Sequence, residues 1–157
     1  MELREATIRD IDSVVDLIEA MLQDMASYGG HALNEASEIR LQLRTHFTDA
    51  SERDDHIFLL AVPQGTEEDP VGVVEASVAC PHEVFQPKSV LHIHSIYVAP
   101  SYRGEGVGRK LLEAALEWGR GKGCAEAELN VLAGNPARKL YEDAGFDVFE
   151  LEMRLGL

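Results

Sequence analysis

Residues 98–112 read VAPSYRGEGVGRKLL, with three glycines at alternate positions between an apolar run and a helical pattern. A strand that ends at Val98 and a helix that begins near Gly108 leave main-chain amides converging on a helix N-terminus, where unpaired N–H groups and the helix dipole favour an anion. Glycine permits the positive φ angles that such a nest of amides needs. The charged residues of the turn are Arg103, Glu105, Arg109 and Lys110. The pattern predicts a phosphate-binding turn, and a tight turn that needs glycine only for its geometry is the alternative.

Two common nucleotide motifs do not fit this turn. A P-loop requires G-x-x-x-x-G-K-[ST], and no such string occurs in the sequence. A dinucleotide fingerprint requires G-x-G-x-x-G after an early strand, with an acidic residue about 20 positions further on. Here Gly104, Gly106 and Gly108 form G-x-G-x-G and follow the fourth predicted strand. Both interpretations are therefore disfavoured.

Hydrophobic spacing predicts ordered elements on both sides of the turn. The predicted helices cover residues 11–25, 38–47, 109–123 and 135–145. The predicted strands lie at Leu3 and over residues 56–62, 70–79, 89–100, 125–132 and 146–155. The runs at 56–62 and 70–79 are expected to form a hairpin. In the last helix we expect Asn135 as N-cap, Pro136 at the first helical position and Gly145 just beyond the end. This order predicts an α/β (α+β) sandwich with a mixed sheet.

Length and charge limit the classes of protein and partner. A chain of 157 residues with 45% apolar content fits one globular domain, residues 1–157, with its own core. The net charge of −14 repels polyanions and favours cationic partners, so no nucleic acid partner is expected. No apolar run approaches the ~18 residues of a membrane span, so no membrane association is expected.

The two cysteines, Cys80 and Cys124, lie far apart and show neither a C-x-x-C pair nor a metal-type spacing. This pattern suits a reducing compartment better than a disulfide scaffold. We therefore expect a soluble, cytoplasmic protein in which both cysteines are small buried apolar residues.

The glycine turn and the segment after it resemble a known family. In VAPSYRGEGVGRKLL, Arg103 opens the pattern Q/R-x-x-G-x-G/A, which is similar to the acyl-CoA-binding motif of the GNAT superfamily of N-acetyltransferases. The strings LNV and NPARKLYEDAGF resemble the next strand and helix of that superfamily. The residues in the customary places are Asn130, Asn135, Ala137, Tyr141, Gly145 and Phe146. The order of elements matches from Leu3 to Leu155, so the resemblance covers essentially the whole chain.

The resemblance implies a fold and a co-substrate. It implies a single GNAT-like domain whose mixed sheet has about six to seven strands, splayed between the fourth and fifth, with about four helices on both faces. Acetyl-CoA would bind with its pyrophosphate on the amides of residues 104–109 and its pantetheine arm along residues 96–98. The implied cofactor-binding residues are Ile96, Tyr97, Val98, Arg103, Gly104, Glu105, Gly106, Val107, Gly108, Arg109, Asn135, Ala137 and Tyr141. The thioester would lie in the splayed gap.

Acetyl transfer from a thioester to an amine raises two proton problems. A primary amine with a pKa near 10 lies about three units above neutral pH, roughly 4 kcal/mol from its nucleophilic form, so a base is useful. His92 and His94 share one face of a regular strand. Their distance to Arg103 resembles the arylalkylamine N-acetyltransferase branch, where a histidine pair on this strand relays the proton through water. Tyr141 matches the superfamily's general-acid tyrosine, which would protonate the leaving thiolate. The alternatives are packing roles for Tyr141 and for the histidines, and a bulge that shifts the strand's parity.

Other candidate residues carry weaker signals. Glu75 on the neighbouring strand and Tyr28 near the end of the first helix are candidate substrate-binding residues. Met21 and Met25 occupy the region where the superfamily shapes its acceptor pocket, although methionines at helical spacing are commonly core. A metal site built on the histidine pair needs a third ligand, and only His82 or Glu83 is near in sequence, so no metal is expected.

The sequence therefore predicts an acetyl-CoA-dependent N-acetyltransferase that works by direct attack in a ternary complex. The acidic composition suits a small cationic amine, which we expect as the acceptor, but it would also suit a basic peptide, so a protein N-terminus or lysine is the alternative. A sensor that binds acyl-CoA without transferring the acyl group is a third possibility. Many relatives are dimers, so a homodimer is possible.

Overall fold

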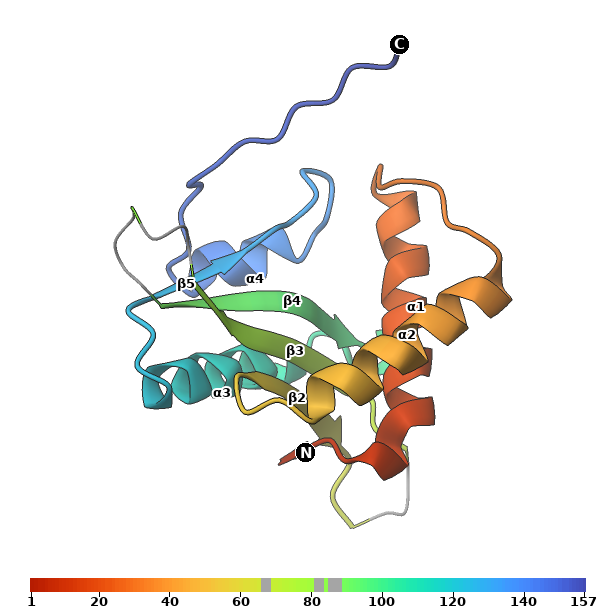
Figure 1. Cartoon of the computed structure of the whole chain (residues 1–157), viewed down its shortest axis with the longest axis vertical. Helices are drawn as coiled ribbons and strands as arrows, with labels where there is room; N and C mark the ends of the chain where they lie inside the picture. Colours follow the sequence, from red (N-terminus) through yellow and green to blue (C-terminus); the bar gives the residue numbers. More distant parts are fainter. Residues whose placement is uncertain (66–68, 81–83, 85–88) are drawn as a thin grey trace.

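The computed structural model describes residues 1–65, 69–80, 84 and 89–157 and contains one mixed sheet at its centre (Figure 1). The strands are β1 (Glu2–Glu5), β2 (His56–Val62), β3 (Gly72–Ala79), β4 (Val90–Val98) and β5 (Glu126–Leu129), in the spatial order β1-β2-β3-β4-β5. Neighbouring strands from β1 to β4 are antiparallel, and β4 pairs with β5 in parallel. The predicted mixed sheet and the predicted hairpin over 56–79 are confirmed.

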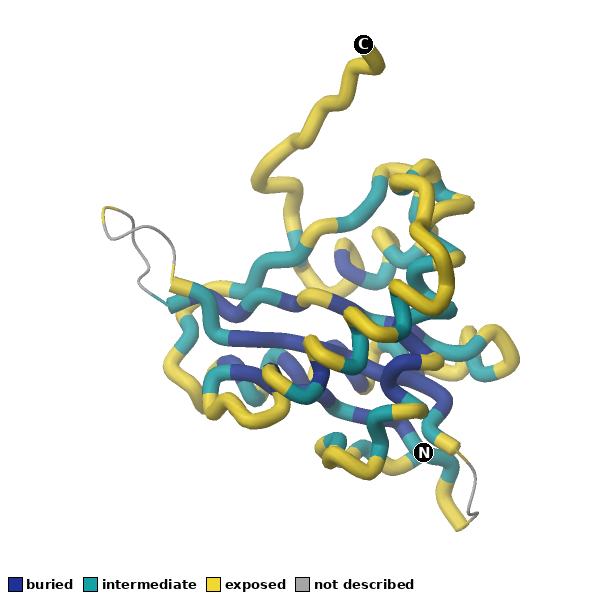
Figure 2. Tube along the Cα trace, turned by 45° about the vertical axis from the view of Figure 1, so that its right-hand side comes forward, coloured by how far each residue is buried: buried dark blue, intermediate teal, exposed yellow. Residues whose placement is uncertain are grey.

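Helices cover both faces of the sheet, as predicted. They are α1 (Ile11–Ser27), α2 (Ala36–Ser51), α3 (Val107–Gly121) and α4 (Arg138–Asp143), and short 3₁₀ turns occur at Ile8–Asp10 and Pro100–Tyr102. One core lies under α1 and α2, where Val14, Phe47 and Phe58 are buried together. A second core lies under α3 and α4 and contains Leu111 and Tyr141. Figure 2 shows the central strands as the most buried part of the trace.

Burial explains why the central strands are nearly continuous apolar runs. Strands β2 and β3 are covered on both faces, so alternation with polar residues is lost along HIFLLAV and GVVEASVA. In α3, Leu111, Leu112 and Ala115 are fully buried at helical spacing, which fixes this helix against β3 and β4. Within the described residues, no helix combines the length and the apolarity needed to cross a bilayer.

A bulge interrupts β4 where the candidate histidines lie. Glu75 pairs with Ser95 and Ala76 pairs with Ile93, which leaves His94 as the extra residue of β4. A bulge changes the parity of a strand, so His94 and Ser95 both reach the sheet face that α1 and α2 cover. A bulge that shifts the parity of this strand, one of the alternatives for the histidines, therefore occurs. His92 and His94 remain neighbours, with ring centroids 4.7 Å apart.

The predicted count of six to seven strands is wrong: the described sheet has five. The predicted strand over 146–155 is absent because this segment leaves the domain beside α4 and pairs with no strand (Figure 1). Its backbone has no ladder partner, and its apolar side chains, Val148, Phe149, Leu151, Met153 and Leu155, are exposed. Residues 147–155 are exposed, as Figure 2 shows.

Smaller corrections concern the cysteines and one helix boundary. Cys80 is exposed because it directly follows the last residue of β3, and Cys124, between α3 and β5, is only partly buried. Helix α4 begins at Arg138 with Ala137 as its N-cap, so the predicted N-cap at Asn135 and first helical position at Pro136 are wrong. Asn135 still caps the turn before it, because its Oδ1 accepts a hydrogen bond from the amide of Ala137 at 2.9 Å.

Candidate active site

The glycine turn joins β4 to α3 and presents unpaired main-chain donors. Gly104 and Gly106 have φ angles of +81° and +80°, and Gly106 is the N-cap of α3. In the described structure, the amides of residues 104–109 donate no hydrogen bond to another residue. These donors surround the N-terminus of a helix of 15 residues, so the turn is suited to an anion.

Arg103 ties this turn to the first helix. Its Nε donates to the Val98 carbonyl at 2.8 Å, and its Nη2 forms an ion pair with Asp24 of α1 at 2.7 Å. The guanidinium also lies over the Tyr97 ring, 5.2 Å from the centroid. In this structure, Arg103 therefore positions the turn against α1, and its charge stays close to the unpaired amides.

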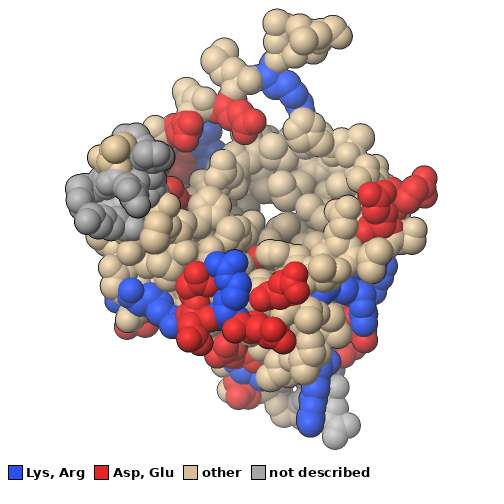
Figure 3. Space-filling view, in the orientation of Figure 1, with Lys and Arg blue, Asp and Glu red and all other residues tan. Residues whose placement is uncertain are grey.

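A pocket lies where β4 and β5 separate. Their pairing ends at Ile93 and Leu129, although β4 continues to Val98. The pocket has a volume of about 60 Å³, which suits the end of a chain rather than a whole coenzyme. It is lined by Met21, Met25, Ile93, His94, Ser95, Ile96, Leu129, Asn130, Val131, Leu132, Asn135 and Tyr141. Figure 3 shows this face hollowed, with mostly uncharged side chains around the hollow.

Tyr141 contributes a phenol to the pocket. Its ring is packed in the core under α4 and is 7% exposed. Burial raises the pKa of Tyr141 to about 12. Its hydroxyl donates a hydrogen bond to no described residue, and the oxygen is not fully buried. The hydroxyl is therefore available to a ligand in the pocket.

His94 contributes an imidazole to the same pocket. Its Nε2 lies 2.7 Å from the Ser77 hydroxyl, and its ring stacks on His56 at a centroid distance of 5.4 Å. Desolvation lowers the pKa of His94, although the nearby Glu75 carboxylate opposes the shift. The imidazole is therefore neutral near pH 7 and is able to accept a proton. His92 lies beside it and outside the pocket lining.

Comparison with known proteins agrees with this geometry. The model of the Acetyltransferase (GNAT) family matches residues 17–146. An uncharacterized N-acetyltransferase of Archaeoglobus fulgidus is 30% identical over 142 residues, which cover 90% of this chain and 89% of that protein. The chain belongs to the GNAT family. It is therefore an acyltransferase of the N-acetyltransferase class, and GNAT enzymes use acetyl-CoA.

Two further similarities are more limited. The aminoglycoside N(6')-acetyltransferase type 1 of Salmonella typhimurium is 34% identical over 62 residues, which cover 39% of this chain and 43% of that protein. A predicted acetyltransferase with acetyl-CoA from Clostridium acetobutylicum has a TM-score of 0.78, covers 99% of this chain and 95% of that one, and is 17% identical. At that identity, the similarity shows the GNAT fold alone.

The GNAT fold brings together some of the predicted site residues and separates others. Asn135, Ile96, His94 and Tyr141 line one pocket, as described above. Tyr28 follows the end of α1 and is not part of the pocket lining. His82 and Glu83, named above as possible third metal ligands, lie outside the described residues.

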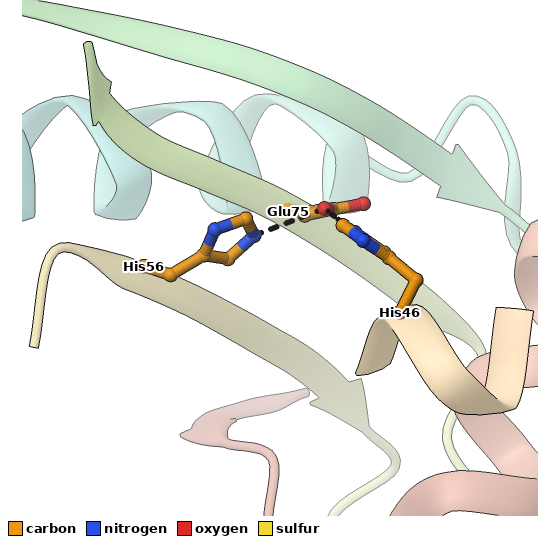
Figure 4. A group of neighbouring side chains, drawn as sticks. All are labelled: His46, His56 and Glu75. Atoms are coloured by element: carbon orange, nitrogen blue, oxygen red, sulfur yellow. Dashed lines mark hydrogen bonds and ion pairs between the residues drawn. The ribbon is translucent and has the colours of Figure 1, made fainter. Parts of the chain in front are cut away.

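Glu75 occupies an unexpected position in this GNAT domain. Its side chain is 4% exposed and contacts His46 of α2 and His56 of β2, as Figure 4 shows. Its other oxygen accepts a hydrogen bond from the Ser95 hydroxyl at 3.2 Å. Burial alone raises the pKa of Glu75, but the hydrogen bonds from the two histidines outweigh burial and lower it. Both oxygens are therefore engaged, and neither lines the pocket.

Sequence reasoning assigned no role to His46 or His56. The two residues are ten positions apart, on different elements, and match no motif. The one available signal was His56 itself, a polar residue at the start of an apolar strand.

Proposed function

We propose that this GNAT enzyme transfers the acetyl group of acetyl-CoA to the primary amine of a small cationic molecule. The observation that carries the proposal is the arrangement around β4. The six unpaired amides of residues 104–109 follow the end of this strand, and the middle of the strand lines the pocket that contains His94 and Tyr141. A cofactor that binds its phosphates at the turn and extends along β4 reaches both side chains.

The fit to acetyl-CoA rests on the chain's own donors. The positive φ angles of Gly104 and Gly106 aim successive amides outward, which is the geometry of an anion nest. Past Ile93, the β5 side of β4 has no strand partner, so an extended ligand can pair with the main-chain groups of residues 96–98 on that side, apart from the Val98 carbonyl, which accepts a hydrogen bond from Arg103. Bound acetyl-CoA supplies an activated acetyl thioester. Arg109 and Lys110, in the first turn of α3, add positive charge beside the turn.

Two side chains divide the proton chemistry. His94 takes a proton from the amine as the new C–N bond forms, with Ser77 holding its ring by the 2.7 Å contact. His92, in edge contact with His94, supports the same ring. Tyr141 donates its hydroxyl proton or a hydrogen bond to the departing sulfur as the C–S bond breaks. No cysteine lines the pocket, so direct attack by the amine is the proposed route.

A small amine is favoured over a peptide acceptor for two reasons. The pocket of about 60 Å³ accepts the end of a chain, and the net charge of −14 attracts cations. The partial similarity to an aminoglycoside acetyltransferase supports the same acceptor class. Tyr28 remains a proposed substrate contact, reached only if the acceptor extends from the pocket toward the end of α1. Glu75 is not retained in this role, because its side chain is 4% exposed and both of its oxygens are engaged by His46, His56 and Ser95.

The test is acetyl-CoA-dependent thiol release with a panel of aminoglycosides, polyamines, thialysine and peptides with free amines, together with calorimetric titration of CoA. We expect turnover with a small amine and none with peptides. Gly106→Ala forces an L side chain to φ +80°, which costs roughly 1–2 kcal/mol, and should weaken CoA binding. Gly121→Ala is the matched control, because its added Cβ meets nothing within 4 Å.

The possible results separate the alternatives. Turnover only with peptides replaces the small amine by a protein or peptide acceptor. Tight CoA binding without turnover across the panel favours a sensor. Absence of CoA binding to folded protein contradicts the proposed role of the glycine turn.

We also propose that two copies of the chain pair through their C-terminal segments. Phe149, Leu151, Met153 and Leu155 are at least 80% exposed and alternate with Glu150, Glu152 and Arg154. This is the pattern of a strand with one apolar face. Strand β5 is an edge of the sheet, so a segment from a second copy has a place to add. A monomer leaves these side chains in water.

Light scattering during size-exclusion chromatography tests this pairing. Leu151→Lys places a charge on the apolar face and should weaken the dimer at least roughly 10-fold, because burying one such side chain contributes about 1.5–3 kcal/mol. Glu152→Lys adds the same group on the opposite face and should leave the dimer intact. A monomeric wild-type protein, or equal effects of the two substitutions, contradicts the pairing.

A further inference from the structure

Three side chains with metal-binding chemistry converge beside the active site (Figure 4). The Nε2 atoms of His46 and His56 lie 2.5 and 2.9 Å from the same oxygen, Oε1 of Glu75. The three ligand atoms are within 4.8 Å of one another. They come from α2, β2 and β3, so folding alone brings them together.

We propose that His46, His56 and Glu75 bind one divalent transition-metal ion of the Zn²⁺ type. Two imidazole nitrogens and one carboxylate oxygen form a ligand set that zinc commonly takes, with the remaining position left to water. This site goes beyond acetyl transfer, and none of its three residues lines the active-site pocket.

The spacing is close to what such an ion needs. Ligands about 2.0 Å from a tetrahedral zinc ion lie roughly 3.3 Å apart. The observed separations of 2.5 and 2.9 Å therefore have to open by roughly 0.8 and 0.4 Å. The His46 side chain is 49% exposed, so it is free to move outward by that distance and to admit the ion from solvent.

The surrounding structure holds the other two ligands in place. His56 and Glu75 are each 4% exposed and lie on paired strands, with Glu75 opposite Phe58. The Ser95 hydroxyl donates to Oε2 of Glu75 and leaves Oε1 directed at the histidines. Phe47 packs against Phe58 at a centroid distance of 4.8 Å and anchors the turn of α2 that carries His46. A fixed carboxylate with an outer hydrogen bond is typical of metal sites.

The charge of the cluster also favours a cation. Glu75 is a carboxylate whose side chain is only 4% exposed. Among the described residues, it forms no ion pair with a lysine or an arginine. Its contacts are two imidazoles and one hydroxyl. A divalent ion balances the charge and replaces both hydrogen bonds with stronger contacts.

The inferred role of the ion is to cross-link α2 to the sheet. Helix α2 packs on α1 and on β2, and α1 supplies Met21 and Met25 to the pocket wall. A cross-link from α2 to β2 and β3 therefore stabilises the acceptor side of the pocket without touching the reacting atoms.

The test uses metal alone, with no acetyl-CoA, so its result is independent of transferase activity. Protein without a polyhistidine tag is stripped with EDTA and titrated with Zn²⁺ by calorimetry and with Co²⁺ by visible absorption. We expect one equivalent to bind, with Co²⁺ bands of a four- or five-coordinate ion. His46→Ala should abolish binding and, being at a half-exposed position, should still fold. Glu75→Gln should also abolish it, and Ser95→Ala should weaken it by about 10- to 100-fold.

His31→Ala is the matched control, because His31 is exposed and lies on the segment between α1 and α2, outside the cluster. Its metal affinity should equal that of the wild type. Three results overturn the proposal: no saturable binding by wild-type protein, binding that survives His46→Ala, or loss of binding in His31→Ala. Circular dichroism confirms the fold of each variant, and His46→Ala decides the matter if Glu75→Gln does not fold.

Discussion

Replacing Tyr141 by phenylalanine removes one hydroxyl and little else. The ring stays packed in the core under α4, where the residue is 7% exposed. The hydroxyl has no partner among the described residues, so no buried group is left unsatisfied by its removal. We expect the free energy of unfolding to change by less than about 0.5 kcal/mol. The Kd for CoA should also stay near the wild-type value, because the amides proposed to bind its phosphates are untouched.

The catalytic effect should be large. The pKa of Tyr141 is raised from 10 to about 12, which corresponds to about 2.7 kcal/mol in favour of the neutral phenol. The hydroxyl therefore keeps its proton at every pH where the enzyme is folded and active, and it is always able to donate to the leaving sulfur. Loss of a positioned general acid lowers kcat by about 10²–10⁴-fold.

The assay measures kcat by thiol release with saturating acetyl-CoA and the best amine of the panel, for wild type and Tyr141→Phe, from neutral to alkaline pH. The wild-type profile should show no loss from Tyr141 ionisation near pH 10, where an ordinary tyrosine titrates. Two results refute the reasoning. One is a variant that keeps most of its kcat. The other is a loss of wild-type activity near pH 10 that the substitution removes.

Two further predictions concern stability. Gly119→Ala puts a Cβ 2.8 Å from Cδ2 and 3.1 Å from Cβ of the buried Leu91, so thermal unfolding should show a loss of about 1–3 kcal/mol. Gly121→Ala meets nothing within 4 Å and should be neutral or stabilising by up to about 1 kcal/mol, and equal effects of the two substitutions contradict this contact. The hydrogen bond and ion pair with Arg4 lower the pKa of Asp10 from 3.8 to about 2, so Asp10 stabilises the fold above about pH 4, and this contribution is lost as the pH falls toward 2. Asp10→Asn should lower the free energy of unfolding, measured in urea, by about 1–2 kcal/mol at pH 7 and by almost nothing at pH 2. An equal loss at both pH values contradicts this link between the ionisation of Asp10 and stability.

The sequence was most informative where local chemistry determines the structure. The glycines of the turn have few conformational alternatives between a strand and a helix, and Gly104 and Gly106 do adopt positive φ. The amphipathic patterns of α1 and α3 extend over enough residues to predict helices rather than strands. These elements and their order were sufficient to predict the mixed sheet with helices on both faces.

Contacts between distant elements were not predictable in the same way. His46 meets Glu75 across 29 positions, and only the packing of α2 on the sheet determines that contact. The bulge at His94 depends on the register of β3 against β4, which no local pattern encodes. The alternation over 146–155 is typical of a strand, but a strand forms only where it pairs with a neighbour, and in the described structure this segment pairs neither with the open edge of β5 nor with any other strand.

The candidate site occurs where the regular pairing of β4 stops. At His94, the bulge puts two adjacent residues on one face, so that the imidazole reaches the pocket while Ser95 holds Glu75. After Ile93, the ladder with β5 ends, and beyond Val98 the glycine turn leaves its amides unpaired. The end of the ladder and the glycine turn leave main-chain groups without a protein partner, whereas the bulge changes which side chains reach the pocket. Because unpaired main-chain groups are available to hydrogen-bond a ligand, these three interruptions along one strand explain why binding and chemistry are expected at β4.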